Sequence, residues 1–145
     1  MAQQWALPPK IKILEALGAI GDKRITFNDN SATVVGSSGN RKYEVKFSEN
    51  KISSTDNGSM FKGYIGYPAI AFLMLKGILP QHKKMSDALK GIRWRELNEK
   101  FKAYWKTEFV VEKILNKKGI QDKETEAFCS AVLAKLKQLK LERFD

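Results

Sequence analysis

The sequence contains a single cysteine, Cys129, and a single histidine, His82. One cysteine excludes an internal disulfide framework and a cysteine-rich zinc site. One histidine removes the histidine clusters that bind metals, and nearly all general-base chemistry that depends on an imidazole. Only carboxylates, lysines and hydroxyls are left as candidate catalysts. We therefore expect no metal and no cofactor, and the sequence identifies no catalytic residue.

Long apolar runs are also missing. The stretch formed by residues 68–79 is apolar except at Lys76. As a helix it would reach only about 18 Å, against roughly 30 Å for the hydrocarbon layer of a membrane. No N-terminal apolar run with a cleavage site is present either. We expect a soluble, cytoplasmic protein without a membrane partner.

Positive charge is the property that the chain has in excess. The formal net charge is +10. Up to Pro80 we count 10 basic and 6 acidic residues, and after it 16 and 10, so the surplus is spread along the chain. Such a surplus attracts polyanions and acidic surfaces. A lysine-rich surface that serves solubility would have the same composition, so charge by itself assigns no function.

The N-terminal half combines two periodicities. From Lys10 to about Ile20 apolar residues recur at helical spacing, which predicts a first helix. Between Arg24 and Asp56 the period changes to two, most clearly in residues 41–47, and turn-forming residues recur at intervals. These features predict a three- or four-stranded antiparallel meander. Residues 68–79 then predict a buried central helix that covers the apolar face of the sheet.

The sequence pattern of the C-terminal half predicts helices. A short helix is expected to begin at Ser86 and Asp87, followed by helices from Arg93 to about Lys106, from Thr107, and from Asp122. The fold class predicted is α+β: an N-terminal helix, the antiparallel meander, the buried central helix and a helical C-terminal half. We expect a single domain over residues 1–145, with residues 81–145 packed on residues 1–80.

The connection formed by residues 56–67 is the most suggestive stretch for chemistry. It places glycines, a lysine and hydroxyls just before the N-terminus of a helix, where free N–H groups favour anions. The residues that would bind an anion there are Ser59, Lys62, Gly63 and Gly66. The pair Gly63 and Gly66 also matches the Gly-x-x-Gly of a KH loop, which clamps a nucleic-acid backbone. Alternatively, these glycines only let the chain turn closely against the sheet.

Basic residues in the helical half predict a phosphate-binding surface without base-specific readout. The candidates are Lys83, Lys84, Arg93, Arg95, Lys102, Lys106, Lys117 and Lys118. The last two predicted helices have the outline of a helix-turn-helix. However, Asp122, Glu124 and Glu126 would stand where a recognition helix meets DNA, and phosphates would repel them.

The sequence does not determine the function, and three hypotheses remain. The first is a small non-catalytic nucleic-acid-binding domain. The second is a module that binds another protein or a second copy of itself through unused apolar positions, namely Trp5, Met60, Phe61, Leu133 and Leu141. The third is a small-molecule enzyme or an anion-binding protein that uses residues 56–67, with Asp56 as a candidate base.

Overall fold

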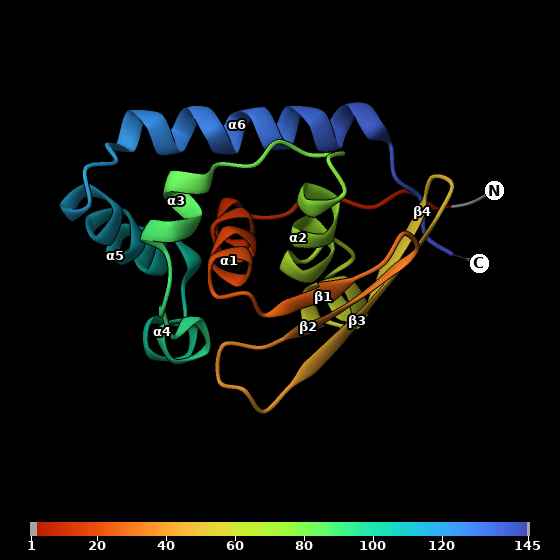
Figure 1. Cartoon of the computed structure of the whole chain (residues 1–145), viewed down its shortest axis with the longest axis horizontal. Helices are drawn as coiled ribbons and strands as arrows, with labels where there is room; N and C mark the ends of the chain where they lie inside the picture. The colour runs from red at the N-terminus through yellow and green to blue at the C-terminus, as the bar shows by residue number, and fades with distance from the viewer. Residues whose placement is uncertain (1–2, 145) are drawn as a thin grey trace.

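The computed structural model describes residues 3–144 and confirms the α+β class. The chain enters α1 (Lys10–Gly21) directly after Pro9, whose backbone is extended. The middle of α1 is buried on all sides, so this helix lies inside the molecule. Figure 1 shows α1 beside α2, with the sheet below them and the long α6 above.

The predicted meander is confirmed as an antiparallel sheet of four strands within the described residues. The strands are β1 (Ile25–Phe27), β2 (Ser31–Val35), β3 (Lys42–Ser48) and β4 (Lys51–Ser54), in the order β1-β2-β3-β4. Val34 pairs with Tyr43, and Phe47 pairs with Ile52. Because side chains alternate along a strand, one face of the sheet is apolar and buried. Its fully buried residues are Ala32, Val34, Val45 and Ile52.

The predicted central helix covers this face, but it is shorter than residues 68–79. It is α2 (Tyr67–Leu75), and it packs on all four strands. The chain leaves the helix at Gly77, whose φ is +79°. The Gly77 N–H donates to the carbonyl of Met74, and the Ile78 N–H donates to that of Leu73. These two bonds form a Schellman motif, which ends the helix and folds Ile78 back toward the core.

The helical half consists of α3 (Lys83–Ala88), α4 (Trp94–Phe101), α5 (Tyr104–Lys117) and α6 (Asp122–Leu139). Helices α3, α5 and α6 all contact α1. Figure 1 shows α6 lying across the helices, and its end returns the chain to β4, near the N-terminal segment. None of the helices in residues 3–144 is long and apolar enough to span a membrane.

Two predicted helix starts are wrong. Helix α3 begins at Lys83 rather than at Ser86, because Nδ1 of His82 caps it by accepting the N–H of Met85 at 3.1 Å. The helix predicted from Arg93 to Lys106 breaks at Lys102, where φ is +55°, and α5 begins at Tyr104 rather than at Thr107.

The apolar residues proposed for a protein contact are not one surface. Leu141 is buried, and Trp5 and Leu133 pack against the core. The indole N–H of Trp5 also donates to the carbonyl of Ile52 at 2.9 Å. Met60 and Phe61 remain largely exposed.

Candidate functional site

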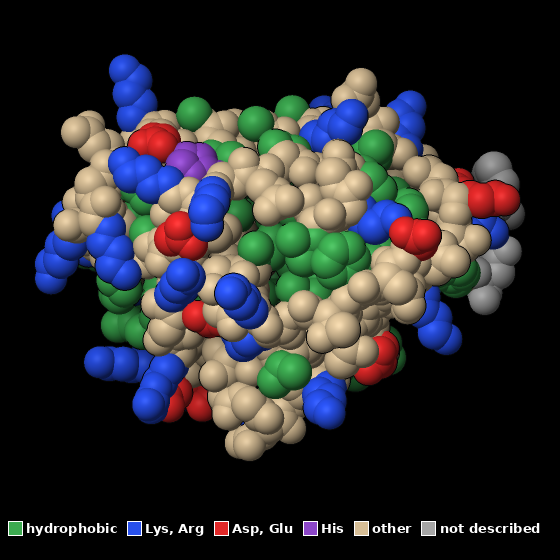
Figure 2. Space-filling model, in the orientation of Figure 1, with side chains coloured by type: hydrophobic (Ala, Val, Ile, Leu, Met, Phe, Trp, Pro, Cys, Tyr) green, Lys and Arg blue, Asp and Glu red, His purple; other side chains and the backbone are tan. Residues whose placement is uncertain are grey.

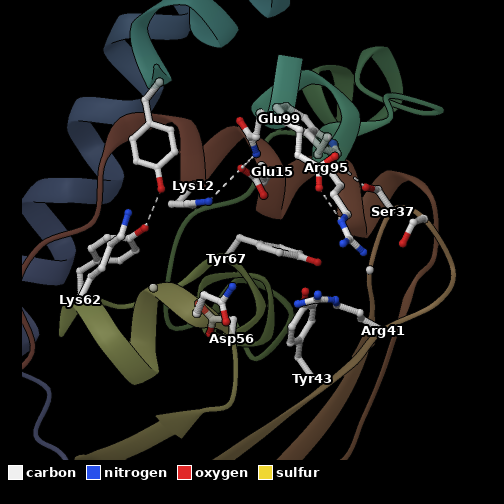
Figure 3. A pocket seen from close by; sticks show the side chains of 18 of the residues that line it. Lys12, Glu15, Ser37, Arg41, Tyr43, Asp56, Lys62, Tyr67, Arg95 and Glu99 are labelled. Atoms are coloured by element: carbon white, nitrogen blue, oxygen red, sulfur yellow. Dashed lines mark hydrogen bonds and ion pairs between the residues drawn. The ribbon is translucent and has the colours of Figure 1, made fainter. Parts of the chain in front are cut away.

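A polar pocket of about 560 Å³ lies where α1, the β2–β3 connection, residues 56–67 and α4 meet. Its wall includes part of η1 (Gly58–Lys62), a turn of π-helix. Figure 3 shows the side chains that face it. The basic residues among those described in its lining are Lys12, Arg24, Arg41, Lys62, Arg95 and Lys102. The acidic ones are Glu15, Asp56 and Glu99, and the aromatic ones are Tyr43, Tyr64, Tyr67, Trp94 and Tyr104.

One end of the pocket contains guanidinium groups gathered around the β2–β3 connection. The Arg24 Nη1 donates to the carbonyl of Val35 at 2.6 Å. The backbone of Arg95 donates to the hydroxyl of Ser37 at 3.3 Å, and its Nε donates to Glu99 at 3.0 Å. Arg41 stands at the other side of the same connection. We call Arg24, Arg41 and Arg95 the guanidinium end.

The other end contains ammonium groups around a phenol. The Nζ atoms of Lys12 and Lys62 lie 5.0 and 5.5 Å from the centre of the Tyr104 ring. The hydroxyls of Tyr104 and Tyr64 are 3.1 Å apart. We call Lys12, Lys62 and Tyr104 the ammonium end. Figure 3 shows Lys12 and Lys62 on the opposite side of the pocket from Arg41 and Arg95.

The tyrosines of the pocket differ in acidity. Burial raises the pKa of Tyr64, and the bond to Tyr104 raises it further. Burial also raises the pKa of Tyr67, more than the nearby Arg24 lowers it. For Tyr104, burial would raise the pKa as well, but the Tyr64 hydroxyl and the ammonium groups of Lys12 and Lys62 outweigh it, so the pKa is lowered. Tyr104 is thus the phenol best suited to donate a proton or a strong hydrogen bond to an anion.

The buried carboxylates in the wall are already held by donors. Glu15 accepts from Nζ of Lys12 and Nδ2 of Asn98, each at 3.1 Å. Asp56 accepts from the hydroxyls of Ser54 and Ser59 at 2.5 and 2.8 Å and from the N–H of Ser59 at 3.2 Å. Asp56 therefore ties residues 56–67 to the end of β4, a structural role distinct from that of a free base.

Several buried polar atoms of the wall lack partners. Among the described residues these are Nη2 of Arg24, Nε1 of Trp94 and Oδ1 of Asn98. All three residues line the pocket. A buried polar atom without a hydrogen bond costs about 1–3 kcal/mol. A polar ligand or a water molecule that reaches these atoms would supply the missing partners.

The anion-binding residues predicted in residues 56–67 lie in different environments. Lys62 lines the pocket. Ser59 is buried, and its hydroxyl donates to Asp56 while accepting the N–H of Gly66 at 3.1 Å. The Gly66 N–H is therefore already bonded within the protein. Gly63, with φ +73°, ends η1, and its carbonyl accepts the N–H of Ala6. The glycines thus shape the loop, and Lys62 faces the cavity.

The basic residues predicted to bind nucleic acid do not share one environment. Arg95 and Lys102 line the pocket. Lys83 and Arg93 form ion pairs with Asp87 and Glu96. Of the remaining four, Lys84 donates to the carbonyl of Gly119 and Lys118 to that of Ala88. Lys106 lies over the ring of the adjacent Trp105, and Lys117 is exposed at the end of α5.

Sequence reasoning missed Lys12, Arg24 and Arg41 as site residues. Lys12 stands on the first predicted helix, and the two arginines flank predicted strands, 17 positions apart in the chain. Each also has an ordinary explanation as a surface charge. One signal was present in the sequence: Arg41 follows the turn at residues 37–40, where a side chain at the hairpin end can fold over a cavity.

Comparisons with known proteins identify a family. The model of the family described as "Uncharacterised conserved protein UCP014422" matches residues 5–142. No curated protein and no solved structure matches the chain. The match covers nearly the whole chain, including every element that builds the pocket, so the chain belongs to this family.

Proposed function

We propose that this member of the family binds a small anionic metabolite, bearing phosphate or carboxylate groups, in the pocket. The observation that carries the proposal is the convergence of cations. Lys12 of α1, Lys62 of η1 and Arg95 of α4 face one cavity, and so do residues from the connections between elements, namely Arg24, Arg41 and Lys102.

The balance of charge supports an anionic ligand. Three of the cations have counter-charges: Arg95 pairs with Glu99, Lys12 with Glu15, and Arg24 with Asp22. Among residues 3–144, no carboxylate forms an ion pair with Arg41, Lys62 or Lys102. Like charges that converge without counter-charges repel one another. An anion in the cavity would relieve this repulsion and gain charge-assisted hydrogen bonds.

The size of the cavity supports a small molecule. Ligand pockets in proteins typically have volumes of about 300–1,000 Å³. The pocket, at about 560 Å³, lies within this range. Tyr43 and Tyr67, whose rings meet edge to face with their centres 6.0 Å apart, provide apolar surface beside the cations. The wall thus combines charge with surface for a carbon skeleton.

The first test is calorimetric titration with inorganic phosphate and pyrophosphate at roughly 50 mM salt. We expect the Arg41→Gln variant to bind at least about tenfold more weakly, because a guanidinium is lost from the guanidinium end. The matched control is Arg93→Gln, since Arg93 is an exposed arginine that pairs with Glu96 outside the pocket. Equal affinities in the two variants, or no binding by the unaltered protein, would contradict the proposal.

Nucleic-acid binding is the second candidate function. In Figure 2, Lys and Arg side chains gather on the face over α3 and α4, although carboxylates stand among them. The same titration with single- and double-stranded DNA and RNA distinguishes the candidates. Binding through several phosphates should weaken by about a thousandfold between roughly 50 and 200 mM salt. Under this alternative, Arg93→Gln would weaken binding as much as Arg41→Gln does.

A further inference from the structure

We infer that the ligand of the pocket carries an anionic group at each of two ends, as in a sugar bisphosphate or a phosphorylated carboxylate. This inference rests on the proposed function and names its ligand class. It follows from the division of the cations into the guanidinium end and the ammonium end, which Figure 3 shows on opposite sides of the cavity.

The guanidinium end offers several donors to one anion. The Arg24 Nη2 is buried and has no partner among the described residues. Arg41 is exposed at the rim and forms no ion pair there. The Ser37 hydroxyl, which accepts the N–H of Arg95, still has its proton to donate. Planar guanidinium groups bind phosphate and carboxylate through pairs of parallel hydrogen bonds, so this end suits a tetrahedral or planar oxyanion.

The ammonium end offers a second, chemically different set of donors. The ammonium groups of Lys12 and Lys62 lie close to the Tyr104 ring, and their positive charge lowers the pKa of its hydroxyl. Of these cations, Lys12 already has Glu15 as a counter-charge, whereas Lys62 has no ion pair among the described residues. Lys62 therefore carries the excess positive charge of this end. An anion bound to Lys62 could also accept a hydrogen bond from the Tyr104 hydroxyl.

The region between the ends disfavours a third anion. Tyr67 lies there, with the Glu15 and Asp56 carboxylates on either side in Figure 3. Glu15 is 4% exposed and Asp56 is 6% exposed, so their negative charge is only weakly screened by solvent. A neutral middle that carries hydroxyl groups would instead donate hydrogen bonds to these oxygens or to Oδ1 of Asn98, which has no donor among the described residues.

The test compares ligands that differ only in the second anion. Fructose bisphosphate carries a phosphate at each end, and the corresponding monophosphate carries one. Phosphoglycolate and phosphoglycerate extend the comparison to shorter molecules with a carboxylate as the second anion, against glycerol phosphate. In calorimetric titrations at fixed ionic strength, we expect the best two-ended probe to bind at least about tenfold more tightly than its one-anion analogue.

Two substitutions at opposite ends complete the test. We expect Arg41→Gln and Lys62→Gln each to lower the affinity for the two-ended probe. Only one of them should lower the affinity for the monophosphate. Arg93→Gln, outside the pocket, should change neither affinity. The two-ended ligand is refuted if no two-ended probe binds more tightly than its one-anion analogue, or if both substitutions lower the affinity for the monophosphate equally. Either result would leave the proposal of an anion-binding pocket intact. If the unaltered protein binds none of the probes, the proposed function itself fails.

Discussion

Phe72→Ala is expected to lower the free energy of unfolding by about 3–5 kcal/mol. Phe72 of α2 is completely buried. Its ring packs edge-on against Phe27 and Phe47 of the sheet, with ring centres 6.5 and 5.8 Å away. Truncation removes apolar contacts and leaves a cavity between α2 and the sheet, which the strands can close only in part. Urea denaturation followed by circular dichroism measures the change.

Phe61→Ala provides the matched control for this prediction. Phe61 is also a phenylalanine of a helical segment, but its side chain is 80% exposed. Its truncation should change the free energy of unfolding by no more than about 0.5 kcal/mol. Similar losses of unfolding free energy in the two variants would mean that Phe72 does not pack between α2 and the sheet.

Gly66→Ala is the second substitution with a large expected effect. It should lower the free energy of unfolding by about 3 kcal/mol. The backbone of Gly66, with φ −79° and ψ 170°, suits any residue, so the effect is steric. A Cβ atom at this position would lie 1.9 Å from Oδ2 of Asp56. Asp56 would have to move away, which breaks its bonds to Ser54 and Ser59 in a buried place. Urea denaturation again measures the loss.

The same substitution should weaken binding of the two-ended probe, because the segment that it displaces bears Lys62 of the ammonium end. Gly36→Ala is the control: Gly36 also lines the pocket, but its Cβ would have the carbonyl of Arg41 as nearest atom, at 3.6 Å, an ordinary contact. Gly36→Ala should change stability by less than about 1 kcal/mol. A stable Gly66→Ala variant that no longer binds phosphate would instead indicate direct contact between Gly66 and the anion, as the sequence hypothesis held.

The secondary structure followed largely from local pattern. The alternation of Tyr43, Val45 and Phe47 with charged residues predicted β3, and the helix predicted from Asp122 is α6. Burial of Cys129 raises the pKa of its thiol to about 12 and leaves it an inert core residue. These features depend on neighbours along the chain, which the sequence displays directly.

Errors arose where a tertiary contact overrode the local pattern. The short helix was expected to begin at Ser86, yet His82 caps α3 at Lys83, and the Nε2 of His82 lies 2.8 Å from Glu124 of α6. The break at Lys102 was missed because only a few per cent of non-glycine residues adopt positive φ. A lysine in the sequence gives no sign that its backbone is left-handed. This break lies at the site, because Lys102 itself and the next two residues, Ala103 and Tyr104, line the pocket.

By itself, the sequence determined the α+β class, the antiparallel meander with its covering helix, and an excess of positive charge. Only the tertiary structure decided where that charge gathers. Lys12, Arg41 and Lys62 lie far apart in the chain, and of these the sequence indicated Lys62 alone as a site residue. The packing of α1, the sheet and residues 56–67 brings them to one cavity. A site built by such long-range packing leaves no periodicity or spacing in the sequence, because its geometry depends on contacts between distant segments.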